Sequence, residues 1–378
     1  MSKNILFVVH DLKGGGIQKI TVDTARYHAS IGNKVKILTF KKGQDFTFDF
    51  ECELEVLPLI SIYLMMPWMV IYKILYKLVL RYLFPRSEFI WAGKLYAIAF
   101  KRFLKKENNT YDAIFVNGAR SMHRLHSCKQ ENIVFSLHLP YVLSKVERSF
   151  YTDFLFKTLF SDKKIFAVSD FIKKPIELRA KELHVSNLKL ETIYNPCDKN
   201  SLQKLAQKDL DFKPEFIVAV GRLCSQKRFD ILIKAYDKSR IDCDLVIVGG
   251  GSDSHKNMLE KLIKDLNLEG KVHLVGFDKN PFKWMKRSRF FILSSDIEGF
   301  VLVVNEALAC GAPVIATDCG PVTEILTGKL SEGIVPKGDI GALAEKIKEF
   351  NVSPIYPTAG VVSKLSFKDI INKQLSLI

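Results

Sequence analysis

The sequence predicts an α/β protein made of two doubly wound domains, each with a parallel sheet. Short apolar, β-branched stretches alternate along the chain with stretches of helical spacing, which is typical of parallel sheets covered by helices. The length of 378 residues suits two domains of roughly 150–200 residues each. Polar and charged residues replace the apolar pattern between Asn195 and Pro214, so the domain boundary is expected there.

The first half begins with a βαβ unit. Lys3–Val9 is short and apolar on both faces, as a buried parallel strand is. A loop of three glycines follows, then Ile17–Ile31 with helical spacing, and then a second strand, Val35–Phe40. A parallel sheet with right-handed crossovers is therefore expected. Further strands are predicted at 113–116, 133–137, 165–168 and 190–194, with helices between them.

The second half repeats the alternation more regularly. Strands are predicted at 216–220, 244–248, 272–275, 290–293 and 313–316, and helices at 229–238, 256–266 and 302–310. Gly311 fits the C′ position of the last helix, and Pro313 starts the next strand. In such sheets ligands bind beyond the carboxyl ends of the strands, so a site in the space between the two domains is expected.

The composition favours some classes of binding partner but does not identify one. The formal net charge of +15 favours nucleic acid, acidic lipid headgroups or phosphorylated small molecules. The 7 cysteines form no CxxC pair, which argues against a zinc site or a redox dithiol and suits a reducing compartment. The apolar run Ile5–Val9 is too short for a signal peptide, so a cytoplasmic protein is expected.

The segment Leu57–Lys106 departs from the alternating pattern. Its part Val56–Tyr72 is a nearly charge-free run of roughly 17 residues, at the lower limit for a membrane span, but Pro58 and Pro67 interrupt it. The continuation carries a cation about every turn: Lys73, Lys77, Arg81, Lys101, Arg102, Lys105 and Lys106. We expect an amphipathic surface that lies on anionic lipid, peripheral to the inner face of the membrane. A core helix with a solvated basic face is the alternative.

Two glutamates mark the most informative stretch, Ser294–Asp318. Glu298 is expected in the loop after a strand, and Glu306 on the helix that follows, with seven residues between them. Backbone N–H groups near Gly299–Val301 would point into the same space and could hold an anion or a sugar hydroxyl. Charged residues are usually solvated, so the pair alone is a modest signal.

Two cations mark a second stretch, which leaves the carboxyl end of the predicted strand 216–220. Gly221 permits a tight turn, Arg222 offers a fork of donors, and Lys227 adds a point charge five residues further on. Two cations beyond a strand end suit a diphosphate. Two basic residues on a loop are nevertheless ordinary in a chain with 56 of them.

The stretches GRLCSQK, VIVGGGSD, VHLVGF and EGFVLVVNEALACGAPVIATD resemble, in that order, the C-terminal half of the retaining glycosyltransferases of family four. Upstream, HDLKGGGIQK, FAVSD and IYNPCD resemble the N-terminal half of that family. The likeness is weak across Gln44–Asn108, where acceptor-binding segments vary. The resemblance implies a GT-B fold of two Rossmann-like domains: an acceptor domain at 1–198, a donor domain at 199–362, and a helix at 363–378 packed back on the first.

The resemblance also implies catalytic roles. Arg222 and Lys227 would bind the donor diphosphate and stabilise its departure, and Glu298 would bind sugar hydroxyls near the anomeric carbon. His138, after a predicted strand, matches a histidine that contacts the reacting sugar, although a packed histidine is the alternative reading. No DxD-like pair stands at a strand end, so no metal and no other cofactor is expected.

Further residues would bind the substrate. Glu306 would hold the ribose hydroxyls, and the glycines of the first loop would approach phosphates or acceptor. The other expected binding residues are Gly14, Gly15, Gly16, Asn195, Gly221, Gly249, Gly251, Gly299, Phe300, Val301 and Leu302. The implied reaction moves a hexose or N-acetylhexosamine from a UDP-sugar to a lipid-linked glycan of a lipopolysaccharide, O-antigen or capsule. GDP-mannose is the alternative donor.

Other classes fit less well. A dinucleotide-binding oxidoreductase would need a third glycine where Lys19 stands, and no GxxxxGK[ST] loop occurs. Nucleic-acid binding would suit the charge, but the basic residues of Leu57–Lys106 interleave with aliphatic ones. A non-catalytic membrane-surface protein would leave the two cations and two glutamates without a role.

Overall fold

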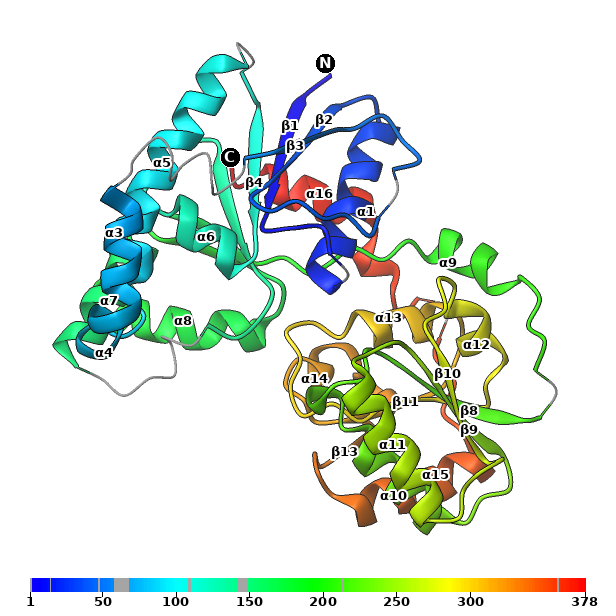
Figure 1. Cartoon of the computed structure of the whole chain (residues 1–378). Helices are drawn as coiled ribbons and strands as arrows, with labels where there is room; N and C mark the ends of the chain where they lie inside the picture. Colours follow the sequence, from blue (N-terminus) through cyan, green and yellow to red (C-terminus); the bar gives the residue numbers. More distant parts are fainter. Residues whose placement is uncertain are drawn as a thin grey trace. The chain divides into compact units, whose positions relative to one another are not determined.

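The computed structural model describes residues 2–13, 15–46, 48–57, 68–107, 110–141, 149–212, 214–358 and 360–378. The chain forms two compact units (Figure 1). Unit 1 comprises residues 1–196 and 367–378, and unit 2 comprises residues 197–366. Both are α/β units built on a parallel sheet, which confirms the predicted fold class.

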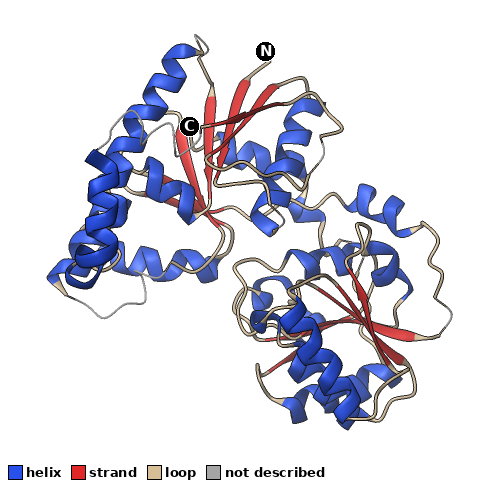
Figure 2. Cartoon of the chain, in the orientation of Figure 1, coloured by secondary structure: helices blue, strands red, loops and turns tan. Residues whose placement is uncertain are grey.

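The sheet of unit 1 has seven strands in the order β3-β2-β1-β4-β5-β6-β7, and every pairing is parallel (Figure 2). The central strands are apolar throughout and buried on both faces, because helices cover the sheet. The strands are β1 (Asn4–Val9), β2 (Lys34–Thr39), β3 (Glu53–Val56), β4 (Ala113–Asn117), β5 (Ile133–Leu137), β6 (Lys164–Ala167) and β7 (Lys189–Thr192).

The helices of unit 1 include one from the far end of the chain. Helix α16 lies beside α1, where the ring of Phe367 stacks on Tyr27 with centroids 5.2 Å apart (Figure 1). Ile370 and Ile371 of α16 are buried. The helices are α1 (Gly16–Ser30), α3 (Trp68–Leu75), the π-helix η1 (Tyr76–Leu80), α4 (Arg81–Leu83), α5 (Glu88–Lys106), α6 (Ala119–Leu125), α7 (Phe150–Phe160), α8 (Asp170–Glu182) and α16 (Phe367–Leu375).

The sheet of unit 2 has six parallel strands in the order β10-β9-β8-β11-β12-β13. They are β8 (Phe216–Val220), β9 (Asp244–Val248), β10 (Val272–Gly276), β11 (Phe291–Leu293), β12 (Val314–Thr317) and β13 (Ile334–Val335). The helices are α9 (Lys199–Ala206), α10 (Phe229–Ser239), α11 (Asp253–Asp265), α12 (Phe282–Arg287), α13 (Leu302–Ala309), α14 (Val322–Ile325) and α15 (Ile340–Val352), with short 3₁₀ turns η3 (Ser225–Lys227), η4 (Gly328–Gly333) and η5 (Ser363–Leu365).

The end of α13 shows how local sequence sets an element. Gly311 has a φ of +84°, which favours glycine. The N–H of Gly311 donates to Leu308 O and the N–H of Ala312 to Ala307 O, both at 3.0 Å. These two bonds form a Schellman motif, so the predicted glycine cap is confirmed. Strands β3 and β13 were not predicted, because the first carries alternating glutamates and the second has only two residues.

The strand order creates one topological switch point in each sheet. In unit 1, β1 lies between β2 and β4; in unit 2, β8 lies between β9 and β11. The connections that leave the two middle strands at a switch point cross to opposite faces of the sheet. In sheets of this kind, ligands bind beyond the carboxyl ends of these strands. In unit 2 this position lies after β8 and β11, where the predicted cations and glutamates stand.

A substitution at Gly249 would test how tightly the loops pack at the carboxyl edge of the unit 2 sheet. A Cβ atom at Gly249 would lie 1.8 Å from the carbonyl oxygen of Gly221, which is backbone and has no room to move. Gly249→Ala should therefore destabilise the protein by about 2–3 kcal/mol, as overpacking does. Gly250→Ala is the matched control, because its Cβ would meet only the Phe277 side chain at 3.5 Å. Equal thermal midpoints for the two variants would contradict the packing described.

Candidate functional site

Lys227 and Glu298 meet at the switch point of unit 2. Lys227 ends the η3 turn after β8, and Glu298 lies in the loop after β11. The Nζ atom of Lys227 donates to Oε1 of Glu298 at 2.7 Å, across a sequence separation of 71 residues. The two side chains are only 17% and 13% exposed. The structure thus brings together one predicted cation and one predicted acid in a partly buried ion pair.

Several further bonds join the two loops that carry this pair. Ser294 donates its hydroxyl to the Lys227 carbonyl at 2.7 Å, and Gln226 donates its amide to the Ile297 carbonyl, also at 2.7 Å. The N–H of Asp296 donates to the Gln226 carbonyl at 3.0 Å. The loops after β8 and β11 are consequently one hydrogen-bonded body, in which Lys227 and Glu298 have fixed positions.

Gly221, the first predicted residue of this loop, lies against Lys227. The Lys227 side chain passes over Gly221, so that a Cβ there would come within 3.1 Å of its Cε atom. Arg222, the next residue, is exposed. Gly249 and Gly251 follow β9, and the N–H of Leu223 donates to the carbonyl of Gly250 at 2.8 Å. These glycines let the loop after β9 pack closely on the loop after β8.

The second acid lies on α13. Glu306 is half-buried in the second turn of this helix, which begins at Leu302, just after Gly299, Phe300 and Val301. The N-terminal end of the helix dipole therefore lies next to Glu298, where a negative charge on a ligand would be favoured. Glu298 is held in place through its own N–H, which donates to the Cys319 carbonyl at 3.1 Å.

His138 of unit 1 ends a chain of buried hydrogen bonds. Thr21 donates its hydroxyl to the Ile17 carbonyl at 2.8 Å and accepts from the Asn117 amide at 2.9 Å. Ser136 donates to the Asn117 amide oxygen at 2.9 Å, and lies 2.8 Å from Nε2 of His138. The Ile17 carbonyl can only accept a hydrogen bond, so the Thr21 hydroxyl donates to it, and this fixes the direction of each following bond. The Ser136 hydroxyl donates to Asn117 and therefore accepts from His138, so Nε2 of His138 carries a proton. In the neutral ring Nδ1 is then an acceptor.

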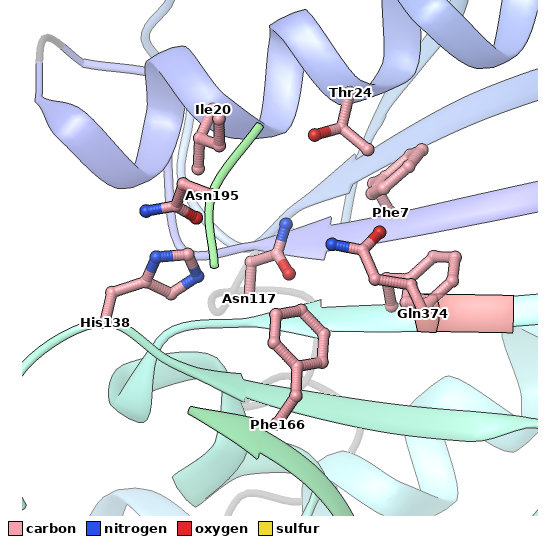
Figure 3. Close-up of a pocket in the computed structure, with 9 residues that line it drawn as sticks. Phe7, Ile20, Thr24, Asn117, His138, Phe166, Asn195 and Gln374 are labelled. Carbon is pink, nitrogen blue, oxygen red and sulfur yellow. The ribbon is translucent and has the colours of Figure 1, made fainter. Parts of the chain in front are cut away.

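His138 lines a small polar hollow in unit 1 together with Asn195 (Figure 3). The hollow also receives Gln374 from α16, a residue that the sequence patterns did not single out. Its lining is Phe7, Ile20, Thr24, Phe115, Asn117, His138, Phe166, Asn195 and Gln374. Two predicted site residues, His138 and Asn195, are therefore neighbours at the carboxyl ends of their strands. Gly15 and Gly16 begin α1, and Gly14 lies outside the described residues.

A basic cluster at the end of β1 was also missed by the sequence patterns. Arg124 of α6 donates from Nη1 to Nδ1 of His10 at 2.7 Å, and its guanidinium lies over the rings of Phe40 and Tyr96, 5.0 and 5.5 Å from their centroids. Burial lowers the pKa of His10 to about 4, and the charge of Arg124 adds to this effect, as do Lys41 and Arg120 more weakly. His10 is therefore neutral near pH 7, and the cluster is cationic.

Two further observations concern metals and membranes. Within the described residues, no group of three or more His, Cys, Asp or Glu side chains is arranged to hold a metal ion. No helix in the described ranges is long and apolar enough to cross a bilayer. Residues 58–67, which hold most of the charge-free run, lie outside those ranges.

Comparisons with known proteins agree with this geometry. Residues 202–357 match the family described as glycosyl transferases group 1. A solved structure from Anabaena, in complex with UDP and glucose, aligns over 100% of both chains with a TM-score of 0.72 and 20% identity. A lipopolysaccharide outer core galactosyltransferase aligns over 99% of this chain and 100% of its own, with a TM-score of 0.68 and 18% identity. The fold is therefore GT-B, the fold of a class of glycosyltransferases.

Curated relatives match part of the chain at higher identity. One is the N-acetylgalactosamine-N,N'-diacetylbacillosaminyl-diphospho-undecaprenol 4-alpha-N-acetylgalactosaminyltransferase of Campylobacter jejuni, 42% identical over 39% of this chain and 40% of its own. Another is the lipopolysaccharide 1,6-galactosyltransferase of Salmonella typhimurium, 29% identical over 49% of this chain and 50% of its own. The chain thus spans about half or less of the length of these relatives. Its similarity to the glycosyl transferases group 1 family is over residues 202–357.

The buried histidines predict sensitivity to acid. Burial lowers the pKa of His138 from 6.5 to about 4. The unfolded chain binds this proton below pH 6.5, and the folded chain only below about pH 4. The free energy of unfolding should therefore fall by about 3 kcal/mol for this one group as the pH drops across that window. His10, His28, His123 and His126 also have pKa values lowered to about 4.

The test compares thermal midpoints at pH 7.5 and pH 5. His138→Asn should reduce the difference between the two midpoints, because one of the lowered pKa values is removed. His255→Asn is the control, since His255 lies at the start of α11 away from the core. An unchanged pH dependence in His138→Asn would show that His138 is not kept neutral by burial.

Proposed function

We propose that the protein is a retaining glycosyltransferase that moves a hexose or N-acetylhexosamine from a UDP-sugar to a lipid-linked glycan. The observation that carries this proposal is the partly buried pair of Lys227 and Glu298 at the switch point of unit 2. The family match of residues 202–357 supports it. The product would belong to a lipopolysaccharide, O-antigen or capsule.

The cations suit the chemistry of the leaving group. When the glycosyl bond breaks, negative charge builds up on the oxygens of the nucleoside diphosphate. Lys227, fixed by the joined loops, and Arg222, exposed next to Gly221, would stabilise that charge, and a fixed donor of this kind is worth about 10²–10³ in rate. This pair takes the place of a metal ion in our proposal, so no cofactor is required.

The acids and His138 would hold the sugar and the ribose. Glu298 would accept hydrogen bonds from sugar hydroxyls, and Glu306 from the ribose. The Nδ1 atom of His138 can accept a bond from a hydroxyl, because its Nε2 donates to Ser136. Retention of anomeric configuration rests on the resemblance to the retaining family.

The relatives support an N-acetylhexosamine and a lipid diphosphate acceptor. The Campylobacter protein is named for transfer of N-acetylgalactosamine to a diphospho-undecaprenol-linked sugar. A lipid diphosphate would suit the basic cluster of His10, Lys41, Arg120 and Arg124, because that cluster lies at the carboxyl edge of the unit 1 sheet. GDP-mannose, the alternative donor, has support from a relative named as a mannosyltransferase of Rhizobium meliloti, at 28% identity.

The segment of α3, η1 and α4 supports a peripheral position at the inner face of the membrane. Tyr76 is its buried side chain, whereas Lys73, Lys77 and Arg81 are exposed. Its exposed large apolar side chains are Trp68, Val70, Ile71, Ile74, Leu75, Leu78, Val79, Tyr82, Leu83 and Phe84. So much exposed apolar surface beside cations suits a helix that lies in the headgroup region of an anionic bilayer.

The first test is donor binding and turnover in the presence of EDTA. UDP and a UDP-sugar should raise the thermal midpoint of the wild-type protein, because they bind the folded chain only. Lys227→Ala and Glu298→Ala should each lower the transfer rate by about 10²–10³. Lys261→Ala and Glu269→Ala, both exposed on the same unit, are the matched controls. Full turnover in Glu298→Ala, or a strict need for Mg²⁺, would reject the proposed site.

The second test is binding to vesicles that contain anionic lipid. Replacing Lys73, Lys77 and Arg81 by Gln should weaken binding on the order of 100-fold, since each cation near such a surface contributes about 1 kcal/mol. The matched control replaces Lys256, Lys261 and Lys264, which are exposed on α11, and removes the same charge. Equal weakening in both triple variants would mean that net charge, not this segment, binds the membrane.

A further inference from the structure

Arg228, the residue after Lys227, has a backbone conformation that is unfavourable for any residue with a Cβ atom. Its φ and ψ are +49° and +42°, in the left-handed region. Glycine adopts this conformation without a steric penalty.

The side chain of Arg228 makes two forked ion pairs. Its Nε and Nη2 atoms donate to the two carboxylate oxygens of Asp230 at 3.1 and 3.2 Å. Its Nη1 atom donates to both oxygens of Asp296 at 3.2 and 3.0 Å. Asp230 lies in the first turn of α10, whereas Asp296 lies in the loop after β11. One guanidinium thus joins the two segments that carry the proposed catalytic pair.

The placement of these pairs relates them to Lys227 and Glu298. Arg228 adjoins Lys227 in sequence, and Asp296 is two residues before Glu298. The side chains of Arg228 and Asp230 are each 30% exposed and that of Asp296 is 41% exposed, so the fork is only partly screened by solvent. It fixes the distance between the two loops, and it neutralises two carboxylates that would otherwise repel an anionic diphosphate at Lys227.

We propose that Arg228 is a positioning residue, whose double fork to Asp230 and Asp296 holds Lys227 and Glu298 in register for the donor diphosphate. This inference rests on the proposed function, since it assigns the fork to the donor site. It gives Arg228 no contact with the reacting atoms. Its effect passes through the two loops.

The chain offers a closely matched control. Arg240, at the other end of α10, is also left-handed, with a φ of +52°. Its side chain is 80% exposed and pairs only with Asp237 of the same helix. Arg228→Gly and Arg240→Gly therefore remove the same charge and the same backbone penalty at the two ends of one helix. They differ in the fork and in burial, since the Arg228 side chain is 30% exposed and that of Arg240 is 80% exposed.

The experiment measures the thermal midpoint, the affinity for UDP, and kcat and KM for both substrates in these two variants and the wild type. Both variants should keep midpoints close to that of the wild type. Arg228→Gly should lower kcat between about tenfold and a hundredfold, as misplacement of a catalytic group does, and weaken UDP binding. KM for the acceptor should not change. Arg240→Gly should match the wild type in every measurement.

A double variant separates the fork from a general loss of charge. Asp296→Asn should slow turnover less than Arg228→Gly, because Asp230 still holds the guanidinium. Arg228→Gly with Asp296→Asn should be no slower than Arg228→Gly alone, since both changes break the same link. Additive losses would overturn the proposal.

The remaining outcomes are also decisive. If Arg228→Gly turns over like Arg240→Gly, the fork has no positioning role. If Arg228→Gly alone loses several degrees of thermal midpoint, Arg228 is a structural residue and the proposal is wrong. If the wild-type protein neither binds UDP nor transfers sugar, the proposed function itself is wrong. This result differs from the two outcomes above, because it is seen in the wild-type protein and not in Arg228→Gly.

Discussion

The pairing of β8 with β11 is the contact on which the proposed donor site depends. These strands are not consecutive, yet they adjoin in the sheet, where the N–H of Val218 donates to the Phe290 carbonyl at 3.1 Å. The loops that carry Lys227 and Glu298 begin at the carboxyl ends of these strands and therefore lie side by side. Three loop-to-loop hydrogen bonds and the Arg228 fork then join those loops. The partly buried ion pair of Lys227 and Glu298, which are far apart in sequence, is thus a consequence of strand order. The hydrogen bonds between the loops then set its geometry.

Unit 1 uses the same architectural rule with different chemistry. Its switch point lies beside β1 and β4, and the polar chain from Thr21 to His138 runs through the ends of β4 and β5. Burial keeps His138 neutral, and the hydrogen-bond chain leaves Nδ1 of its ring as an acceptor. Cations gather at the end of β1 and on α3 and η1. In the proposed function, unit 2 would offer charges to a diphosphate, and unit 1 would offer hydrogen bonds to hydroxyls and cations to an anionic acceptor.

Most strands were predictable, because the buried parallel strands are continuous apolar runs between turn residues. The edge strands β3 and β13 were not, since one alternates with glutamates and the other is only two residues long. Among the predicted site residues, Lys227 and Glu298 were identified by their position after strands, and His138 and Asn195 by the resemblance to the glycosyltransferase family. No sequence pattern identified Arg124, Gln374 or Arg228. Arg124 and Gln374 lie on helices, and Arg228 looks in sequence like one more surface cation.

The sequence by itself determined the alternation of elements, the glycines that the tight loops require, and the similarity of residues 202–357 to a glycosyltransferase family. These depend on local periodicity, turn chemistry and short motifs, which are properties of neighbouring residues. Only the tertiary structure decided that β8 lies beside β11, that α16 returns to α1, and that one arginine links two carboxylates on different loops. The physical reason is that strand order and side-chain contacts across tens of residues follow from packing of the whole sheet. That packing cannot be predicted from a local sequence pattern.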